Sequence, residues 1–232
     1  MVVNFYTLIK RQEEIRDRVI ITNLLTRINY VGGADCGFDD KYVYSCVVVV
    51  DINDLSIIDY ALAKELITTP YIPTFLSFRE EGAIIKSFRN LNVKPDVLFC
   101  DGQGIAHPRR AGLACAVGVR LDIPTIGIAK TKLCGTFSEL KDSTGSFSYL
   151  YYQNIKVGIV LRPRAGVKPI FISPGHKINL EQSFDIVRKT ITKYRIPEPL
   201  RIAHTFANLY KRGNFNLQEF YKKRSNKFNG VI

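Results

Sequence analysis

The sequence lacks the cysteine patterns of a zinc finger or of a disulfide-stapled protein. Its five cysteines are odd in number and lie mostly within apolar segments, and none forms a C-x-x-C pair or has the spacing of zinc ligands. They are Cys36, Cys46, Cys100, Cys115 and Cys134. Because disulfides persist mainly in oxidising compartments, this distribution predicts reduced, buried thiols in a cytosolic protein.

Long hydrophobic runs and targeting signals are missing as well. No apolar stretch approaches the ~18 residues that a membrane-spanning helix needs, and the first residues, MVVNFY, lead into a charged segment rather than a signal-peptide core. We therefore expect a soluble, cytoplasmic protein with no membrane contact. The sequence also has no internal repeat and no linker, so we expect a single domain over residues 1–232. The sequence is silent on oligomeric state, and our expectation is a monomer.

Acidic residues are scarce relative to basic ones. The chain has 21 Asp and Glu against 33 Lys and Arg, a formal charge of +12 and a pI of about 9.5. This excess favours a polyanionic partner, most simply nucleic acid, although a basic protein that binds no polyanion has the same composition. The last residues, 222–232, are basic and polar, and we expect them to form a frayed tail.

The apolar pattern predicts an α/β fold with a mixed central sheet flanked by helices. An antiparallel meander of three strands is expected first, followed by an alternation of strands and helices that implies parallel pairing. The expected strands are 29–38, 42–51, 56–66, 97–100 and 124–130, with a late hairpin over 145–162 and 167–172 and a turn at 173–176. The expected helices are 5–27, 77 to near 95, 109–121, 180–193 and 197–209.

One stretch, residues 97–110, combines features of a phosphate-handling site. A short apolar strand ends in Asp101, at the sheet edge where open α/β sheets bind their ligands. Gly102 and Gly104 follow and allow close backbone approach, and His107 and Arg109 come next. A carboxylate beside basic residues suggests a metal ion that handles phosphate, whereas an ordinary Asp-Gly turn is the structural alternative.

Two further acidic residues are expected to join Asp101. Asp35 ends the first strand and Glu80 lies in the first turn of the following helix. If the first and fourth strands are neighbours, as in the ribonuclease H-like fold, the two aspartates adjoin, and together the three carboxylates can hold one or two ions. Singly, the aspartates could be turn formers and Glu80 a helix N-terminal charge, and the neighbouring Glu81 could replace Glu80.

The segment Pro70-Tyr71-Ile72-Pro73 is stiff and cannot be helical, because two prolines bracket it. A rigid loop that presents an aromatic ring and a branched apolar side chain can enter a duplex and replace lost stacking. A proline-bracketed core turn is the structural alternative.

These segments together resemble the endonuclease V family, which acts at deoxyinosine, the product of adenine deamination. The matching blocks run nearly from end to end of the chain. They are VGGAD (31–35), PYIP (70–73), LSFRE (76–80), DGQG (101–104), HPR (107–109), GIAK (127–130), SPGH (173–176) and YRIPEP (194–199).

The resemblance implies a ribonuclease H-like fold and an endonuclease that depends on Mg²⁺, with Mn²⁺ as a substitute. In this family the cut falls at the second phosphodiester bond 3′ to the lesion and leaves 3′-hydroxyl and 5′-phosphate ends, as a step of DNA repair. The implied partner is DNA that contains deoxyinosine.

The resemblance also assigns the catalytic residues. Asp35, Glu80 and Asp101 match the family's metal-binding carboxylates, and His204 matches a histidine that completes the site as a metal ligand or a proton carrier. Without the resemblance, His204 would be a core or helix-capping histidine. Lys130 follows a strand at the same sheet edge, where a cation can orient water or stabilise the charged phosphate, or can simply be a solvated lysine.

The substrate-binding residues are implied in the same way. The family uses the PYIP loop (Pro70, Tyr71, Ile72, Pro73) as a strand-separating wedge. Leu76, Gly102 and Leu133 match positions of the base pocket, and His107 matches a residue beside the lesion or the backbone. One residue departs from the pattern: Thr74 stands where the family commonly has glycine, and a side chain there is expected to narrow the pocket or restrict the loop.

Three rival functions remain open at this point. The chain could be an inosine-specific endoribonuclease on the same scaffold, because nothing in the sequence selects for or against a 2′-hydroxyl and inosine-containing RNA is a second possible partner. It could be a non-catalytic inosine reader, against which the complete carboxylate set argues. It could also be a junction or hybrid nuclease, which would cut without regard to inosine.

Overall fold

Eight strands form one mixed sheet at the centre of the computed structural model, which describes residues 4–23 and 27–216. The strands are β1 (Tyr30–Phe38), β2 (Tyr42–Asp51), β3 (Ile57–Leu66), β4 (Val97–Cys100), β5 (Thr125–Ala129), β6 (Phe147–Tyr152), β7 (Ile155–Leu161) and β8 (Ile170–His176). Their order in the sheet is β3-β2-β1-β4-β5-β8-β7-β6. The first strand therefore lies beside the fourth, and both the β1–β4 and the β4–β5 pairings are parallel, as the sequence predicted.

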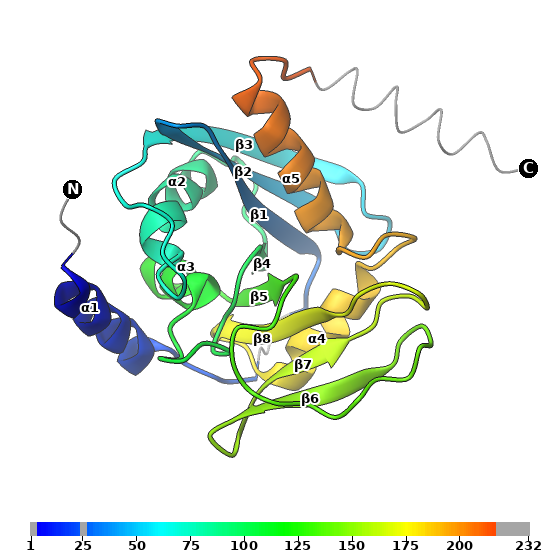
Figure 1. Cartoon of the computed structure of the whole chain (residues 1–232). Coiled ribbons are helices and arrows are strands. Elements are labelled where there is room, and N and C mark those ends of the chain that lie inside the picture. Colours follow the sequence, from blue (N-terminus) through cyan, green and yellow to red (C-terminus); the bar gives the residue numbers. More distant parts are fainter. Residues whose placement is uncertain (1–3, 24–26, 217–232) are drawn as a thin grey trace, which may run out of the picture.

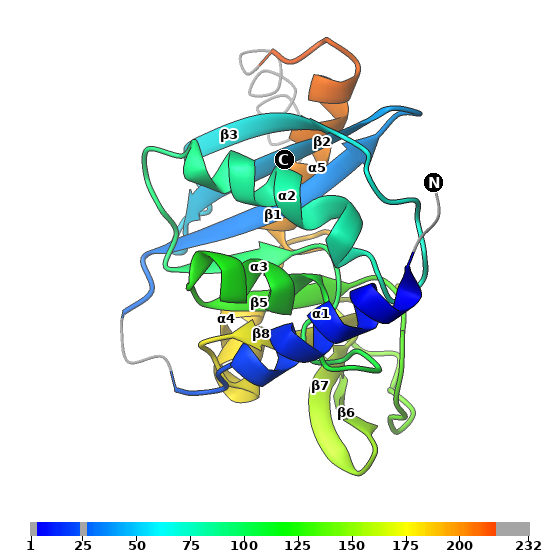
Figure 2. The same ribbon diagram turned by 90° about the vertical axis from the view of Figure 1, so that its left-hand side faces the viewer.

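Helices cover both faces of this sheet, so the predicted α/β fold with a mixed sheet flanked by helices is confirmed (Figure 1). The helices are α1 (Phe5–Arg18), α2 (Ser77–Arg89), α3 (Leu113–Leu121), α4 (Leu180–Lys189) and α5 (Glu198–Lys211). One face carries α2 and α3, with α1 lying across α3, and the other carries α4 and α5 (Figures 1 and 2). None of the helices in the described residues combines the length and apolarity needed to cross a bilayer.

Strand β2, which lies between β3 and β1, shows why helices are needed on both faces of the sheet. Its residues 47–50 are four consecutive valines, all fully buried. Because successive side chains of a strand point to opposite faces, Val47 and Val49 belong to the core cluster on the face of α2 and α3, whereas Val48 and Val50 belong to the cluster on the face of α4 and α5. A continuous apolar run is thus the signature of a strand buried on both faces.

Residues 173–176 are part of strand β8, so the turn predicted there is wrong. The pairing of β8 with β5 shifts register between Thr125 and Ile126, and Pro174 is paired at this irregularity. A bulge tolerates proline because the ladder hydrogen bond that proline cannot donate is already disrupted. The Pro174 carbonyl instead accepts a hydrogen bond from the backbone N–H of Ile105, at 2.8 Å.

Two predicted helices are shorter than their apolar patterns suggested. Helix α1 ends at Arg18 because the next residues are tied to β8: the Ile20 N–H donates to His176 Nδ1 at 3.2 Å and the Ile20 carbonyl accepts from Lys177 N–H at 2.7 Å. Helix α3 begins only at Leu113, because residues 107–112 form a separate loop that is tied by its own hydrogen bonds.

The remaining predicted helix ends differ from the observed ones by about two to six residues. The helices expected to end near 95 and at 193 end at Arg89 and Lys189, and the last helix extends to Lys211. The hairpin predicted over 145–162 is present as β6 and β7, and β8 continues it into the sheet. The expected tail, 222–232, lies outside the described residues.

Candidate active site

Three carboxylates from three different elements surround the carboxyl end of β4. Asp101 follows β4 directly, and its backbone N–H donates to the Ala34 carbonyl of β1 at 3.1 Å, so the neighbouring Asp35 lies at the same level of the sheet. Glu80 lies in the first turn of α2, and both Asp35 and Glu80 are 7% exposed. The structure thus brings together the three acidic residues expected from the sequence, although β1 continues past Asp35 to Phe38 because β2 pairs along its whole length.

The pKa values of this group show how strongly the three charges oppose one another. Burial and the charges of Asp35 and Asp101 raise the pKa of Glu80 well above its usual value. Burial and the charge of Asp35 likewise raise the pKa of Asp101, although Lys130 counteracts part of this effect. The site therefore holds more negative charge than its surroundings stabilise.

Glu80 and Glu81 occupy different environments, which resolves the ambiguity between them. The Glu81 carboxylate accepts a hydrogen bond from Arg120 of α3 at 3.2 Å, and its pKa is raised by burial. Glu80 has no hydrogen bond or ion pair from any described side chain and interacts electrostatically with the two aspartates. Glu80 is therefore the member of the acidic site, and Glu81 belongs to the contact between α2 and α3.

Two cationic or protonatable side chains balance the aspartates. Lys130, just after β5, forms an ion pair with Asp101 Oδ2. His204 of α5 places Nδ1 2.7 Å from Asp35 Oδ2, and this hydrogen bond to the carboxylate raises the pKa of the imidazole. On the opposite side of the ring, Asn208 Nδ2 lies 3.2 Å from His204 Nε2.

The position of α5 depends on a glycine in β1. A Cβ atom at Gly33 would lie 2.3 Å from the backbone carbonyl carbon of Pro199, so no larger residue allows α5 to approach β1 this closely. This close approach brings His204 over Asp35. The contact between the VGGAD and YRIPEP segments is therefore what completes the site.

The donor set fits a divalent cation that prefers oxygen ligands. Carboxylate oxygens are the ligands chosen by such ions, and the raised pKa values of Glu80 and Asp101 express the charge that an ion would neutralise. Across residues 4–23 and 27–216, however, no three acidic, histidine or cysteine side chains already converge as a metal-binding group. Lys130 and His204 hold two of the three carboxylates in this arrangement.

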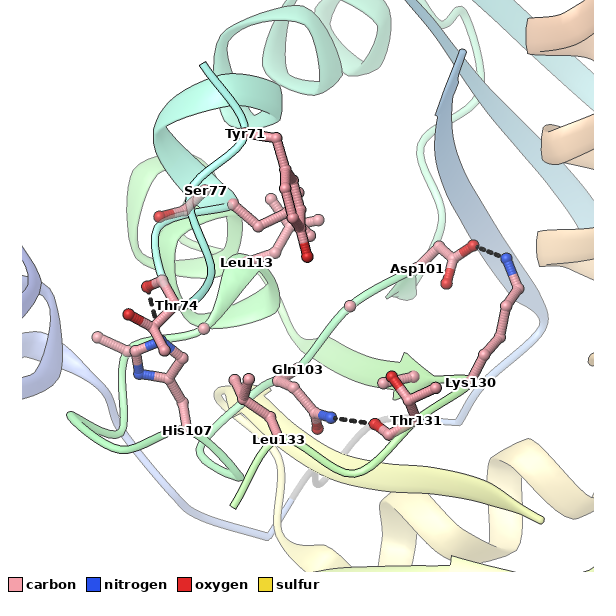
Figure 3. Close-up of a pocket in the computed structure, with 15 residues that line it drawn as sticks. Tyr71, Thr74, Ser77, Asp101, Gln103, His107, Leu113, Lys130, Thr131 and Leu133 are labelled. Carbon is pink, nitrogen blue, oxygen red and sulfur yellow. Dashed lines mark hydrogen bonds and ion pairs between the residues drawn. The ribbon is translucent and has the colours of Figure 1, made fainter. Parts of the chain in front are cut away.

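A cavity of about 260 Å³ opens beside Asp101 (Figure 3). It brings together seven of the residues predicted to bind or cut the substrate. These are Tyr71, Leu76, Asp101, Gly102, His107, Lys130 and Leu133. Pro70, Ile72 and Pro73 do not line it, and Asp35, Glu80 and His204 lie outside its lining as well.

Tyr71 projects from the loop between β3 and α2 and is 65% exposed. The loop is not helical, as its two prolines predicted. Figure 3 shows the ring beside the cavity, on the opposite side from Leu133 and Gln103. An exposed aromatic ring at the rim of a cavity is available to stack on a base.

His107 is buried (2% exposed), and both of its ring nitrogens bond to the protein. Nε2 lies 2.8 Å from the Thr74 carbonyl, which can only accept, so Nε2 carries the proton; Nδ1 accepts from the Arg109 N–H at 3.1 Å. Burial lowers the pKa of His107 to about 4, which keeps the ring neutral. His107 therefore lines the cavity with its ring and fixes the loop that carries Thr74.

Sequence reasoning missed several residues of the cavity, among them Gln103, Thr131 and Ser77. Gln103 Nε2 donates to the Thr131 carbonyl at 3.0 Å, whereas its buried Oε1 has no partner in the described part of the chain. Gln103 belongs to the DGQG block and could have been found there. Thr131 and Ser77 carry no comparable signal in the sequence.

The chain is similar to known proteins along most of its length. The family model Endonuclease V matches residues 13–205. An Endonuclease V of Dictyoglomus thermophilum is 44% identical over 210 residues, covering 90% of this chain and 91% of that protein. An Endonuclease V of Nostoc sp. is 46% identical over 200 residues, covering 85% and 90%.

Solved structures give the same result. The crystal structure of an Endonuclease V from Streptomyces avermitilis superposes with a TM-score of 0.85 at 33% identity, covering 91% of this chain and 95% of that chain. A structure of Ciona intestinalis Endonuclease V, in complex with a 23mer DNA containing an inosine followed by a ribo-adenosine, superposes with a TM-score of 0.80 at 26% identity, covering 91% and 99%.

Proposed function

The chain belongs to the endonuclease V family and is a nuclease, a phosphodiester hydrolase, and from this premise we propose that it acts at deoxyinosine in DNA. It cuts the second phosphodiester bond 3′ to the lesion, leaves 3′-hydroxyl and 5′-phosphate ends, and serves DNA repair. The observation that carries this proposal is the mutually repelling set of the buried Asp35 and Glu80 and the partly buried Asp101, beside a cavity with an exposed aromatic ring at its rim.

Asp35, Glu80 and Asp101 are the residues that would hold the ion, Mg²⁺ or Mn²⁺. The family's nucleases are metal-dependent in general. When bound, such an ion polarises the phosphate and lowers the pKa of water, which supplies the nucleophile. The three carboxylates contribute the negative charge and the oxygen donors, and the burial of Asp35 and Glu80 limits the access of competing water.

Lys130 has two roles in this proposal. Without substrate its ammonium pairs with Asp101 and limits the repulsion between the carboxylates. With a phosphate in place, the same ammonium lies at the rim of the cavity, where it stabilises the charge that develops on the scissile phosphate.

His204 holds a proton at Nδ1 towards Asp35 Oδ2. The hydrogen bond to Asp35 raises the pKa of the imidazole, which favours the protonated ring. His204 therefore orients Asp35 and serves as a proton carrier, and we prefer this role to that of a metal ligand because Nδ1 is engaged by the carboxylate and Nε2 faces Asn208.

The cavity accommodates the lesion base in this proposal, with Tyr71 replacing the stacking lost when the base leaves the duplex. Hypoxanthine carries a proton on N1, where adenine has a lone pair. Gln103 Oε1 is a buried acceptor without a partner in the described residues, and it fits a donor of that kind. The inosine-containing DNA held by the Ciona protein supports this choice of substrate.

The test is nicking of a labelled duplex that contains one deoxyinosine, with and without Mg²⁺. We expect a metal-dependent nick at the second phosphodiester bond 3′ to the lesion. Glu80→Gln should reduce the cleavage rate by more than about 10²-fold, because it removes a charged oxygen donor from the site. Glu81→Gln is the matched control: it changes the next residue in the same way, outside the acidic site, and should cut at nearly the wild-type rate.

Several outcomes would contradict the proposal. Cutting that ignores the inosine would assign a general nuclease, and binding without cutting would assign a non-catalytic reader. Equal losses of cleavage rate in Glu80→Gln and Glu81→Gln would show that Glu80 is not a residue of the active site. The same strand made as RNA, cut faster than DNA, would assign an endoribonuclease instead.

A further inference from the structure

Thr74, the residue that departs from the family pattern, has an unusual backbone conformation. Its φ is +71°, in the left-handed region, where a β-branched side chain is a strong outlier. Glycine adopts this conformation without strain, and threonine does not. Such a conformation persists only when the surrounding structure holds it.

Two polar side chains from distant parts of the chain hold Thr74 in place. The Thr74 carbonyl accepts from Gln12 Nε2 of α1 at 2.6 Å, in addition to its bond with His107. The Thr74 hydroxyl accepts from the guanidinium of Arg109 at 2.6 Å. Arg109 Nε also donates to Gln12 Oε1, so the two side chains support each other. We call Gln12 and Arg109 the Thr74 brace.

The way helix α1 packs on the domain indicates that Gln12 is there to hold Thr74. Along α1, all of which lies in the described part of the chain, Gln12 is the single buried residue and is 0% exposed. A surface helix normally buries an apolar stripe, so a helix whose buried residue is a glutamine is docked for a specific polar contact. Figure 2 shows α1 lying across α3. At its N-terminal end, the ring of Phe5 packs edge-on against Phe75, with centroids 5.8 Å apart.

Thr74 connects the brace to the cavity. It lines the cavity together with Tyr71 and Leu76, so its conformation sets the direction of the loop on both sides (Figure 3). The Arg109 guanidinium also lies 4.5 Å from the centroid of Phe75, directly after Thr74. Arg109 therefore contacts both the hydroxyl of Thr74 and the ring of Phe75, and the Thr74 side chain anchors the loop to Arg109.

We propose that Gln12 and Arg109 are positioning residues for lesion recognition: they hold Thr74 in its left-handed conformation and so fix Tyr71 and the wall of the base cavity. This inference rests on the proposed cleavage at inosine. Glycine would adopt this backbone conformation at position 74 without support. In this chain, Thr74 adopts it because Gln12 and Arg109 hold it there.

The first experiment compares two substrates, because a wedge is needed only where a duplex must be opened. Gln12→Leu removes both brace hydrogen bonds of Gln12, and Glu14→Gln on the exposed side of α1 is the matched control. Under single-turnover conditions we expect Gln12→Leu to slow cutting of the inosine duplex by about tenfold or more, whereas cutting of the same inosine strand alone should stay within about twofold. Equal losses on both substrates would overturn the proposal, as would no loss on the duplex.

The second experiment removes the need for the brace. Thr74→Gly supplies a residue that adopts positive φ without support. In the Thr74→Gly background, Gln12→Leu should therefore cost no more than about twofold on the duplex, which is a strongly non-additive result. Additive losses would show that Gln12 does not act through Thr74.

Hydrogen exchange gives a readout that does not depend on cleavage. Backbone amides of residues 71–76 should exchange faster in Gln12→Leu than in the wild type or in Glu14→Gln. If the wild-type protein does not cut inosine DNA, the proposed function fails. The exchange comparison still tests whether Gln12 holds the loop around Thr74. Unchanged exchange in this segment would overturn the brace even if the enzyme is active.

Discussion

His107 should make the stability of this protein depend on pH in a defined direction. Its ring is buried and neutral, with a pKa lowered by burial to about 4 from the ordinary value of 6.5. Below pH 6.5 the unfolded chain binds a proton at this residue and the folded chain does not. The contribution of the neutral ring to the free energy of unfolding is therefore fully present above pH 6.5 and is lost as the pH falls towards 4.

The size of the effect follows from these two pKa values. One pKa unit corresponds to about 1.4 kcal/mol, so the whole contribution is about 3 kcal/mol. About 2 kcal/mol of it should disappear between pH 7 and pH 5, where the unfolded histidine takes up its proton. Other buried groups titrate too, so the quantity of interest is the difference between the wild type and a variant without the imidazole.

The assay is urea denaturation of the wild type and of His107→Gln, followed by circular dichroism at several pH values. Glutamine has an amide donor for the Thr74 carbonyl and does not titrate. The wild type should lose about 2 kcal/mol relative to His107→Gln between pH 7 and pH 5. A difference that stays constant over this range would refute the neutral, buried His107.

Three further predictions concern the site itself. Lys130→Met should bind the divalent cation more tightly in a calorimetric titration, because no ammonium competes for Asp101, yet cut more than about 10²-fold more slowly; weaker binding would contradict the competition. Tyr71→Ala should slow cutting of the inosine duplex by about tenfold or more and leave single-strand cutting nearly unchanged, and equal effects would rule out a wedge. His204 should affect stability with the opposite sign to His107, because the hydrogen bond to Asp35 raises the pKa of its imidazole. Its contribution to the free energy of unfolding is therefore present below pH 6.5 and is lost as the pH rises through the pKa of the folded state. In denaturation at several pH values, the stability difference between the wild type and His204→Gln should shrink as the pH rises.

Local patterns were enough to predict most of the fold. The valine run of β2, the proline-bracketed loop and the alternation of strands and helices after residue 77 are properties of short segments, and the structure confirms each of them. The neighbouring positions of β1 and β4 were expected because an acidic residue was placed at the end of each predicted strand and because the blocks resemble a known family. The assignment of roles to the site residues stays a prediction.

Contacts between distant segments explain what the sequence did not predict. Strand β8 contains Pro174 because its partner β5 shifts register there, which no local rule indicates. Gln12 and Thr74 are 62 positions apart, and nothing around Gln12 marks it as buried. The ion pair of Lys130 with Asp101 is likewise visible only in three dimensions. Because Lys130 occupies Asp101, the three carboxylates do not already form a metal site.

The pairing of Lys130 with Asp101 has a consequence for how the enzyme can be handled and regulated. A tethered ammonium acts as a resident counterion, so part of the charge on Asp101 is already compensated in the protein without divalent cation. Part of the free energy of cation binding is then used to displace this counterion, so the measured affinity and the rise in melting temperature on cation binding should both be smaller than in Lys130→Met. Chelation should therefore switch the enzyme off without unfolding it, and fresh cation should restore it at once.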